Sequence, residues 1–430
     1  MSLILIPTIA LMLIFISKKL FDTYFNHLAI YTIGWAVICF FYELKLIRFI
    51  NITTEAWGVI FSGTFSYFLG VITYYKFKNE PKSFKLITKR LSFNQKEIKI
   101  IYYIILITGI INLIISLLNW KYLINKFGSI TNVFLQANQI YRMRIAGEIP
   151  EAVPYLFAIG YSGVFFSGIY FSYTNKFNIA ILLVFISIIL KEISVFGREA
   201  ILTAVLIFSF SYFFTNMAIN GKVIFNFKEN KKKIITIILI LLIAITGANL
   251  VRSTRGAFEH FKGTNRAFAN STLSFIITPS MYFYFSSHIG VLSKYLQSPT
   301  PNTSFAANTL LPVYNILSKF EFVEKKSTYQ KGYFIPQWSN TGTYLREVHE
   351  DFGDIGIFIV PYLLGIFLTY LWYKYYSMPN INNLILLVFF NVLNSLTWLV
   401  MISRSSKWFI GMILTYILLV IYNKIRTIIK

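Results

Sequence analysis

The chain has 430 residues, of which 56% are hydrophobic and only 13% are charged, and its mean hydropathy is +0.62. A soluble domain carries about 25% charged residues, so this composition excludes a water-soluble enzyme and predicts a polytopic membrane protein. The apolar stretches are continuous runs rather than short alternating strands, which makes the predicted fold all-α. The net charge of +23 indicates anionic lipid headgroups and membrane orientation, and we expect no nucleic acid partner.

Residues that commonly hold metals or form disulfides are scarce. Cys39 is the one cysteine, which excludes an intrachain disulfide and a cysteine-rich metal site. The histidines at positions 27, 260, 288 and 349 show no metal-ligand spacing. We therefore expect neither a metal site nor a cofactor.

Apolar runs of near-membrane length predict about eleven transmembrane helices. They lie at residues 2–17, 28–42, 56–75, 98–118, 153–174, 178–190, 200–217, 234–250, 355–373, 383–402 and 408–423. We expect the first run to be a transmembrane helix rather than a cleavable signal peptide, because Lys18 and Lys19 follow it instead of preceding it.

Lysine and arginine in the short loops predict the orientation of the chain. Basic residues concentrate directly after the first run, in loop 76–99, in loop 218–233 and in the tail from 424. With eleven spans, all four regions fall on one side, which the positive-inside rule assigns to the cytoplasm. The sequence therefore predicts that the N-terminus lies outside and the C-terminus lies in the cytoplasm.

We expect a single integral membrane domain, residues 1–430, with a long external loop at 251–354 on the periplasmic side. Inside this loop, Phe275–Leu296 is apolar and rich in aromatic residues. A further crossing there would place the basic tail outside. We therefore predict a re-entrant or interfacial helix at this position.

Several arginines stand at the predicted outer ends of spans. Arg198 precedes the run at 200–217, Arg252 and Arg255 follow the run at 234–250, and Arg346 precedes the run at 355–373. A guanidinium donates two parallel hydrogen bonds to a phosphate and does not deprotonate. We therefore predict that these arginines bind the diphosphate of a membrane-borne substrate. The alternative is that each one only anchors its helix among the lipid headgroups.

The segment from Arg346 to Asp354 is the densest cluster of ionisable residues in the chain outside the basic loops. A general base that accepts a proton from a sugar hydroxyl is predicted among His349, Glu350 and Asp351. The alternative for the carboxylates is a favourable position at the N-terminus of the next span. That alternative does not account for His349.

Three stretches of the chain resemble the Wzy-type oligosaccharide repeat unit polymerases, also called O-antigen polymerases. They are Phe196–Ala200 before an apolar run, Arg252–Gly256 after one, and the region from Thr300 to Gly356, with Thr343-Tyr344 and Asp351-Phe352-Gly353 before another. The resemblance covers about residues 190–375.

The resemblance implies a GT-C-like helical fold and a membrane glycosyltransferase at the outer face of the bacterial cytoplasmic (inner) membrane. Such an enzyme transfers a growing glycan from undecaprenyl diphosphate to a hydroxyl of an incoming lipid-linked repeat unit, in the biosynthesis of lipopolysaccharide or another polysaccharide. The expected partners are undecaprenyl-diphosphate-linked oligosaccharides and membrane lipid. A chain-length regulator and a flippase are further candidate partners.

Two other functions remain open. An O-antigen ligase shares the donor and differs in the acceptor, and the Glu350-Asp351-Phe352-Gly353 stretch favours the polymerase over it. A lipid-linked oligosaccharide flippase or other transporter is expected to have short loops and polar residues within its spans. A structural membrane scaffold has no feature in its favour beyond hydrophobicity.

Overall fold

The computed structural model describes residues 2–78, 90–145, 148–221, 278–298, 303–327 and 329–429. These residues form an all-α structure with one two-stranded hairpin, β1 (Tyr333–Phe334) and β2 (Trp338–Ser339). Seven of their helices are long and apolar enough to cross a membrane. The chain is therefore a multi-pass membrane protein, and its described residues separate into two compact units.

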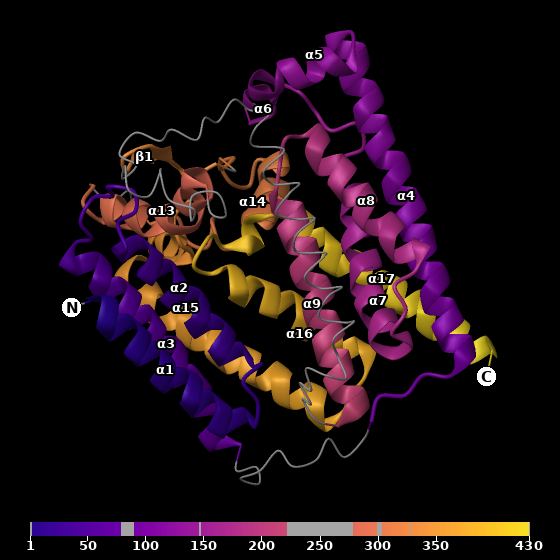
Figure 1. Cartoon of the computed structure of the whole chain (residues 1–430), viewed down its shortest axis with the longest axis horizontal. Helices are drawn as coiled ribbons and strands as arrows, with labels where there is room; N and C mark the ends of the chain where they lie inside the picture. The colour runs from indigo at the N-terminus through magenta and orange to yellow at the C-terminus, as the bar shows by residue number, and fades with distance from the viewer. Residues whose placement is uncertain are drawn as a thin grey trace. The chain divides into compact units, whose positions relative to one another are not determined.

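The first unit comprises Met1–Lys85, Phe258–Tyr373 and Leu393–Ser405. Its N-terminal part is a layer of three helices, α1 (Ser2–Phe21), α2 (His27–Glu43) and α3 (Thr54–Phe77), shown in Figure 1. Side-chain caps begin α2 and α3, because Asn26 accepts a hydrogen bond from the amide of Ala29 and Thr53 accepts one from Ala56. These caps fix where two of the apolar runs become helical.

The longest helix of the first unit packs closely on α3. Helix α15 (Tyr344–Ser377) presents Gly365 to the carbonyl oxygen of Tyr67, and α3 presents Gly70 to the carbonyl oxygen of Tyr362. A Cβ atom built on either glycine would lie only 2.3 Å or 2.1 Å from the facing oxygen. Small residues at a crossing let two membrane helices approach closely, and here both glycines serve that purpose.

Helix α13 (Pro279–Leu296) occupies most of the segment that we expected to be re-entrant or interfacial, and it is not one of the seven candidate spans. It packs on α2 and α3 and on the hairpin. Hydrogen bonds attach it to the end of α2, where Tyr282 donates to the carbonyl of Phe41, and to the α2–α3 connection, where Ser293 accepts from the amide of Thr53. The short α14 (Leu311–Leu317), η2 (Ser318–Phe320) and η3 (Ile402–Arg404) complete this unit.

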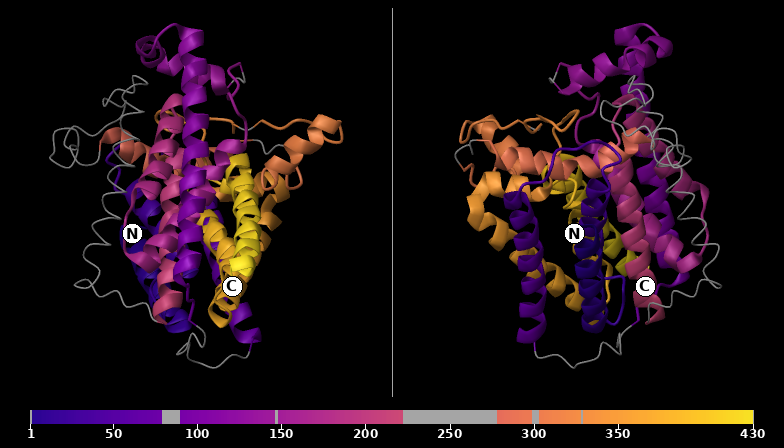
Figure 2. Two further views of the ribbon diagram at one scale, coloured as in Figure 1. Left: turned by 90° about the vertical axis from the view of Figure 1, so that its right-hand side faces the viewer. Right: turned by 60° about the vertical axis from the view of Figure 1, so that its left-hand side comes forward.

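The second unit comprises Leu86–Ala257, Lys374–Val392 and Ser406–Lys430. It contains the described helices α4 (Gln95–Phe127), α5 (Ile130–Leu135), α6 (Ala137–Ile145), η1 (Leu156–Ala158), α7 (Ile159–Thr174), α8 (Ile179–Ser194), α9 (Glu199–Asn220) and α17 (Ser406–Ile429). Helix α16 (Ile381–Leu396) lies largely in it. Figures 1 and 2 show α5 and α6 at the C-terminal end of the long α4.

Buried polar pairs join the helices of the second unit. Asn112 of α4 donates to Ser187 of α8 at 2.9 Å, and Ser116 donates to the backbone carbonyl of the same serine at 2.8 Å. Ser211 of α9 donates to the carbonyl of Phe165 in α7 at 2.7 Å. An unsatisfied polar group is costly in a dry interior, so these bonds select which helices are neighbours.

The predicted apolar runs overlap helices of the structure, but ten of the eleven can be compared and only seven described helices are candidate spans. Every predicted apolar run outside 234–250 coincides with a helix, and the run at 234–250 lies outside the described residues. Helices α2, α8 and α16 have 16 or 17 residues and are not among the seven candidate spans. The part of the segment 251–354, predicted to be an external loop, that follows residue 277 is described except at 299–302 and 328.

Candidate functional site

The candidate site lies in the first unit, at the beginning of α15. This helix consists of two segments that meet at Gly353, where φ is +63° and ψ is −156°. That backbone region is essentially restricted to glycine. The break separates the polar segment Tyr344–Phe352 from the apolar segment that follows, and it allows Asp354 to reach back to His349.

Asp351 fastens the preceding loop to the polar segment. Its carboxylate is buried and accepts hydrogen bonds from the hydroxyl groups of Ser304 and Thr309 and from the amides of Asn308 and Thr309, at 2.7 to 3.0 Å. The Asn308 side chain adds a further bond at 3.0 Å. A carboxylate has about four lone-pair sites, so Asp351 has no capacity left to act as a base.

Arg346 and Glu350 form an ion pair within the same segment. The Arg346 Nε lies 3.0 Å from Glu350 Oε1, and the arginine is 1% exposed. Its guanidinium carbon lies 5.3 Å from the ring centre of Tyr295 and 5.4 Å from that of Tyr333. Two aromatic contacts and one carboxylate hold the guanidinium in a fixed position.

Glu347 connects the polar segment to η3. Its carboxylate accepts from Arg404 Nη1 at 3.1 Å and from the amide of Met401 at 2.7 Å. Gln330 donates a third bond at 3.2 Å. Glu347 is 1% exposed and Arg404 is 9% exposed, so the pair is a buried salt bridge that holds three separate parts of the chain together.

His349 stands in the middle of a short hydrogen-bonded chain. Its Nδ1 lies 2.8 Å from the hydroxyl oxygen of Tyr295, and its Nε2 lies 3.1 Å from Asp354 Oδ1. The carboxylate of Asp354 is an acceptor, so it assigns the ring proton to Nε2. Burial, and then the charge of Glu350, raises the pKa of Tyr295. The tyrosine therefore remains a hydroxyl and donates to Nδ1.

This arrangement has the parts of an oriented general base. A carboxylate sets the tautomer of the imidazole, and the unprotonated Nδ1 faces a hydroxyl. A proton that reaches Nδ1 makes an imidazolium, which Asp354 then stabilises. The chemistry that it supports is removal of a proton from an alcohol.

The four arginines predicted to bind diphosphate have different places. Arg346 is buried in the ion pair described above. Arg198 is partly buried directly before α9, in the second unit. Arg252 and Arg255 lie outside the described residues. Of the three predicted bases, His349 has the geometry of a base, whereas Glu350 is paired and Asp351 is saturated.

The second unit contains a further group of charges that is partly buried. Lys191 Nζ lies 2.7 Å from Glu151, and Lys407 Nζ lies 3.7 Å from Glu151 and 3.5 Å from Glu192. Burial, together with the charge of Lys407, lowers the pKa of Lys191 to about 8. Burial alone would raise the pKa of Glu151, but the two lysines hold it below its usual range.

The sequence analysis did not select Tyr295, Asn308, Thr309 or Glu151. Tyr295 lies 54 residues before His349 in an apolar helix, and Asn308 reads as a turn residue. No spacing links either to the polar segment. In the sequence, Tyr295 is recognisable only as a tyrosine at the end of an aromatic helix. Such tyrosines are too common to identify one of them as a site residue.

Among the described residues, no group of three histidine, cysteine, aspartate or glutamate side chains is placed to hold a metal ion. Comparison of the chain with protein-family models, with curated proteins and with solved structures finds no match.

Proposed function

We propose that the chain is a membrane glycosyltransferase of the oligosaccharide repeat unit polymerase type. It transfers a growing glycan from undecaprenyl diphosphate to a sugar hydroxyl of an incoming lipid-linked repeat unit. The main observation behind this proposal is the row of hydrogen-bonded side chains Tyr295, His349 and Asp354 at the start of a candidate membrane helix. The sequence resemblance in the same segment supports it.

In the proposed reaction, the acceptor hydroxyl oxygen attacks the anomeric carbon of the donor. The bond from that carbon to the diphosphate oxygen breaks, and its electron pair leaves with the diphosphate. The proton of the acceptor hydroxyl passes to Tyr295 as the tyrosine proton passes to His349 Nδ1. Asp354 stabilises the resulting imidazolium. Such a base contributes about 10²–10⁴ in rate.

The leaving diphosphate needs positive charge rather than a proton. We assign that role to Arg198, Arg252 and Arg255, in keeping with the sequence analysis. Arg346 receives a different role, because its guanidinium is committed to Glu350 and two aromatic rings. We assign it to positioning Tyr295 for the proton transfer.

The proposal includes the finer architecture expected from the sequence. It has about eleven spans in a GT-C-like fold, with the N-terminus outside, the C-terminus in the cytoplasm of the bacterium, and α13 as a re-entrant or interfacial helix of the external loop. The partners remain the lipid-linked oligosaccharides, with a chain-length regulator and a flippase as further candidates. The attachment of α13 to the α2–α3 connection supports placing it at the end of those helices.

The test is complementation of a host that lacks the gene, read from its surface glycolipids on a gel. The wild-type chain restores a ladder, whereas His349→Gln and Asp354→Asn leave mostly single repeat units. Asp22→Asn changes an exposed aspartate and is the matched control, so it restores the ladder. Immunoblotting of membranes establishes that all variants are present in equal amounts.

Three outcomes would contradict parts of this proposal. A full ladder from His349→Gln would remove His349 as the base. A deletion strain that displays bare core, with no repeat unit, would indicate the ligase or the flippase instead. A deletion strain with an unchanged ladder would remove the chain from this process altogether.

A further inference from the structure

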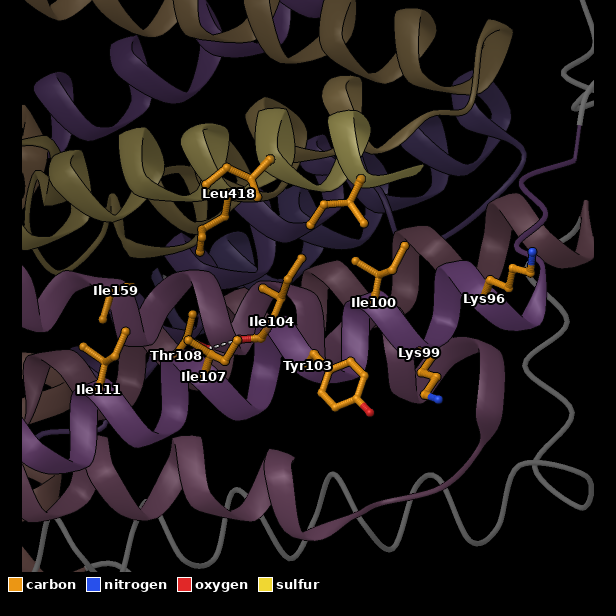
Figure 3. Close-up of a pocket in the computed structure, with 12 residues that line it drawn as sticks. Lys96, Lys99, Ile100, Tyr103, Ile104, Ile107, Thr108, Ile111, Ile159 and Leu418 are labelled. Carbon is orange, nitrogen blue, oxygen red and sulfur yellow. Dashed lines mark hydrogen bonds between the residues drawn. The ribbon is translucent and has the colours of Figure 1, made fainter. Parts of the chain in front are cut away.

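Lipid covers exposed apolar side chains on the candidate spans. The groove between α4 and α17 is an example, because Ile104, Ile107 and Ile111 line it and both helices are candidate spans (Figure 3). The stretch between residues 303 and 339 contains none of the candidate spans, and yet it exposes eight large apolar side chains. They are Phe305, Leu310, Ile316, Phe320, Phe322, Tyr329, Phe334 and Trp338. The spans alone do not account for this group, and such groups on a surface mark contacts with a partner.

The middle of this stretch, residues 310–326, is a loop whose two ends are held by the same short helix. Ser403 in η3 donates a hydrogen bond to the carbonyl of Thr309 at 2.9 Å. The neighbouring Arg404 donates one to the carbonyl of Ser327 at 3.3 Å. The position of this loop, which we call the α14 loop, is therefore fixed from both ends.

The α14 loop is buried at its beginning and apolar on its exposed side. Leu311 and Pro312 are buried at the start of α14, whereas Ile316, Phe320 and Phe322 are 55%, 66% and 76% exposed. Ile316 and Phe320 are four residues apart in consecutive helical turns, so they lie on one side. The ring centres of Phe320 and Phe322 lie 6.3 Å apart. We call these three exposed residues the apolar patch.

Exposed charged residues alternate with the apolar patch. Lys319 and Glu321 flank Phe320 in the chain, and residues 324–326 are charged as well. Charges of this density would be costly within the hydrocarbon core. Aromatic rings beside charged side chains suit the boundary between lipid headgroups and water instead.

The α14 loop begins where the lipid-facing surface of α15 begins. Asp351 accepts a hydrogen bond from the amide of Thr309 at 2.7 Å, and the ring of Phe352 lies 5.8 Å from that of Phe305. Three residues after Phe352, the exposed Ile355 opens the apolar segment of α15, which is a candidate span. The loop is therefore attached at the height at which α15 enters the membrane.

We propose that the α14 loop lies on the surface of the membrane that the chain spans, with the apolar patch among the headgroups and the charged residues facing water. Its partner is the phospholipid bilayer, and the surface that it contacts continues the lipid-facing side of α15. This contact does not depend on the proposed transferase reaction. It would hold the start of α15, and with it His349 and Asp354, at the height of the headgroups.

Nitroxide labels on the purified full chain in nanodiscs of phosphatidylcholine and phosphatidylglycerol test the depth of the apolar patch. Each label is attached to a single cysteine, Phe320→Cys or Phe322→Cys, after Cys39→Ser removes the native cysteine. Both labels should lie about 5–10 Å below the headgroup boundary. They should therefore collide more often with oxygen, which concentrates in the bilayer, than with a water-soluble nickel chelate.

Glu324→Cys is the matched control, because Glu324 is exposed and only two residues from Phe322. Its label should collide mainly with the nickel chelate. Phe322→Trp and Glu324→Trp give the same comparison without replacing Cys39. Brominated lipids should quench the added fluorescence of Phe322→Trp and leave that of Glu324→Trp nearly unchanged.

Two results would overturn the proposal. Labels at positions 320 and 322 that meet the nickel chelate as often as the label at position 324 would place the apolar patch in water. Labels shielded from both oxygen and nickel would place it against protein, and dipolar coupling between labelled chains would then identify a second copy as the partner.

Discussion

His349, Glu350 and Asp351 are neighbours in the chain, yet their surroundings give them different capacities. The Asp351 carboxylate accepts hydrogen bonds from the loop between Ser304 and Thr309, and Glu350 is paired with Arg346. Only His349, among these three, has a nitrogen facing a hydroxyl with a carboxylate behind it. A residue can be a base only if its lone pair is available, and this criterion separates the three.

The buried pair of Glu347 and Arg404 leads to a prediction about stability. Glu347→Gln replaces one of the two acceptor oxygens with an NH2 group, although three donors face this side chain, and leaves the Arg404 charge without its carboxylate. We expect it to lower the free energy of unfolding by about 3–5 kcal/mol. Thermal unfolding of the purified protein, followed by tryptophan fluorescence, measures this loss.

The control for that prediction is Glu324→Gln, which changes an exposed glutamate and should leave the unfolding midpoint almost unchanged. If Glu347→Gln unfolds at the wild-type temperature, the buried salt bridge does not contribute to the stability of the first unit.

At the residue scale, the sequence predicted where the polar residues gather but not the distant partners of His349 and Asp351. The segment from Arg346 to Asp354 stands out because, outside the basic loops, no other segment of its length has so many ionisable residues. The partner of His349 is Tyr295, and the partners of Asp351 lie more than 40 residues before it. Such pairings depend on tertiary packing, which local spacing does not encode.

At the scale of single elements, the break at Gly353 is expected to be required for activity. Gly353→Ala meets no close neighbour, since the nearest atom is Thr303 Cγ2 at 3.7 Å, but it forces a side chain into a glycine-only conformation. We expect about 1–3 kcal/mol of strain. The polymer ladder should shorten or vanish, because the contact of His349 with Asp354 spans the break.

Gly58→Ala provides the matched control, since its Cβ would have no neighbour within 4 Å in the interior of α3. It should raise stability by about 0.5–1 kcal/mol, as alanine does in a helix. A Gly353→Ala protein with a normal ladder and a normal unfolding midpoint would show that the break has no functional importance.

The crossing of α3 and α15 gives a prediction about coupled substitutions. Gly70→Ala and Gly365→Ala each push a methyl group against a facing carbonyl, so each should lower stability by about 1–3 kcal/mol. The double variant should lose less than the sum, because the first methyl group already separates the helices. Unfolding of the two single variants and the double variant measures this. Full additivity would mean that the glycines act independently.

Apolar runs predicted the elements well because hydropathy records which segments avoid water. They did not predict the beginning of α15. The expected run starts at 355, whereas the helix starts at Tyr344, since the polar first segment satisfies its charges against other parts of the chain. Likewise, α16 ends at Leu396 rather than at 402, where η3 supplies Arg404 to Glu347.

At the scale of the whole molecule, the orientation predicted from the basic loops can be tested directly. The one native cysteine, Cys39, is buried and can be replaced by serine. In spheroplasts, a membrane-impermeant maleimide should label Glu324→Cys in the external loop. It should label Lys424→Cys in the tail only after the membrane is opened. The reverse pattern would contradict the predicted orientation.

The division into two units was not predicted, and the expectation of a single membrane domain remains a prediction. Each unit draws on three separate stretches of the chain. One boundary, Lys85–Leu86, lies in the basic loop 76–99, but that loop is similar in composition to the other basic loops. Two further boundaries lie within α15 and α16, where no linker marks them. In membrane proteins, buried polar pairs such as Asn112 with Ser187 define neighbours, and their partners cannot be read from one sequence.

The two sides of His349 differ in their access to water, because Tyr295 on one side is 3% exposed whereas the Asp354 side chain on the other is 89% exposed. Under the proposed mechanism, the proton arrives from the Tyr295 side and departs to bulk water past Asp354. The imidazole then returns to its neutral form before the product leaves. An enzyme whose base loses its proton independently of product release can add several repeat units during one encounter with its substrate. The placement of one exposed aspartate would thus influence how long each glycan becomes.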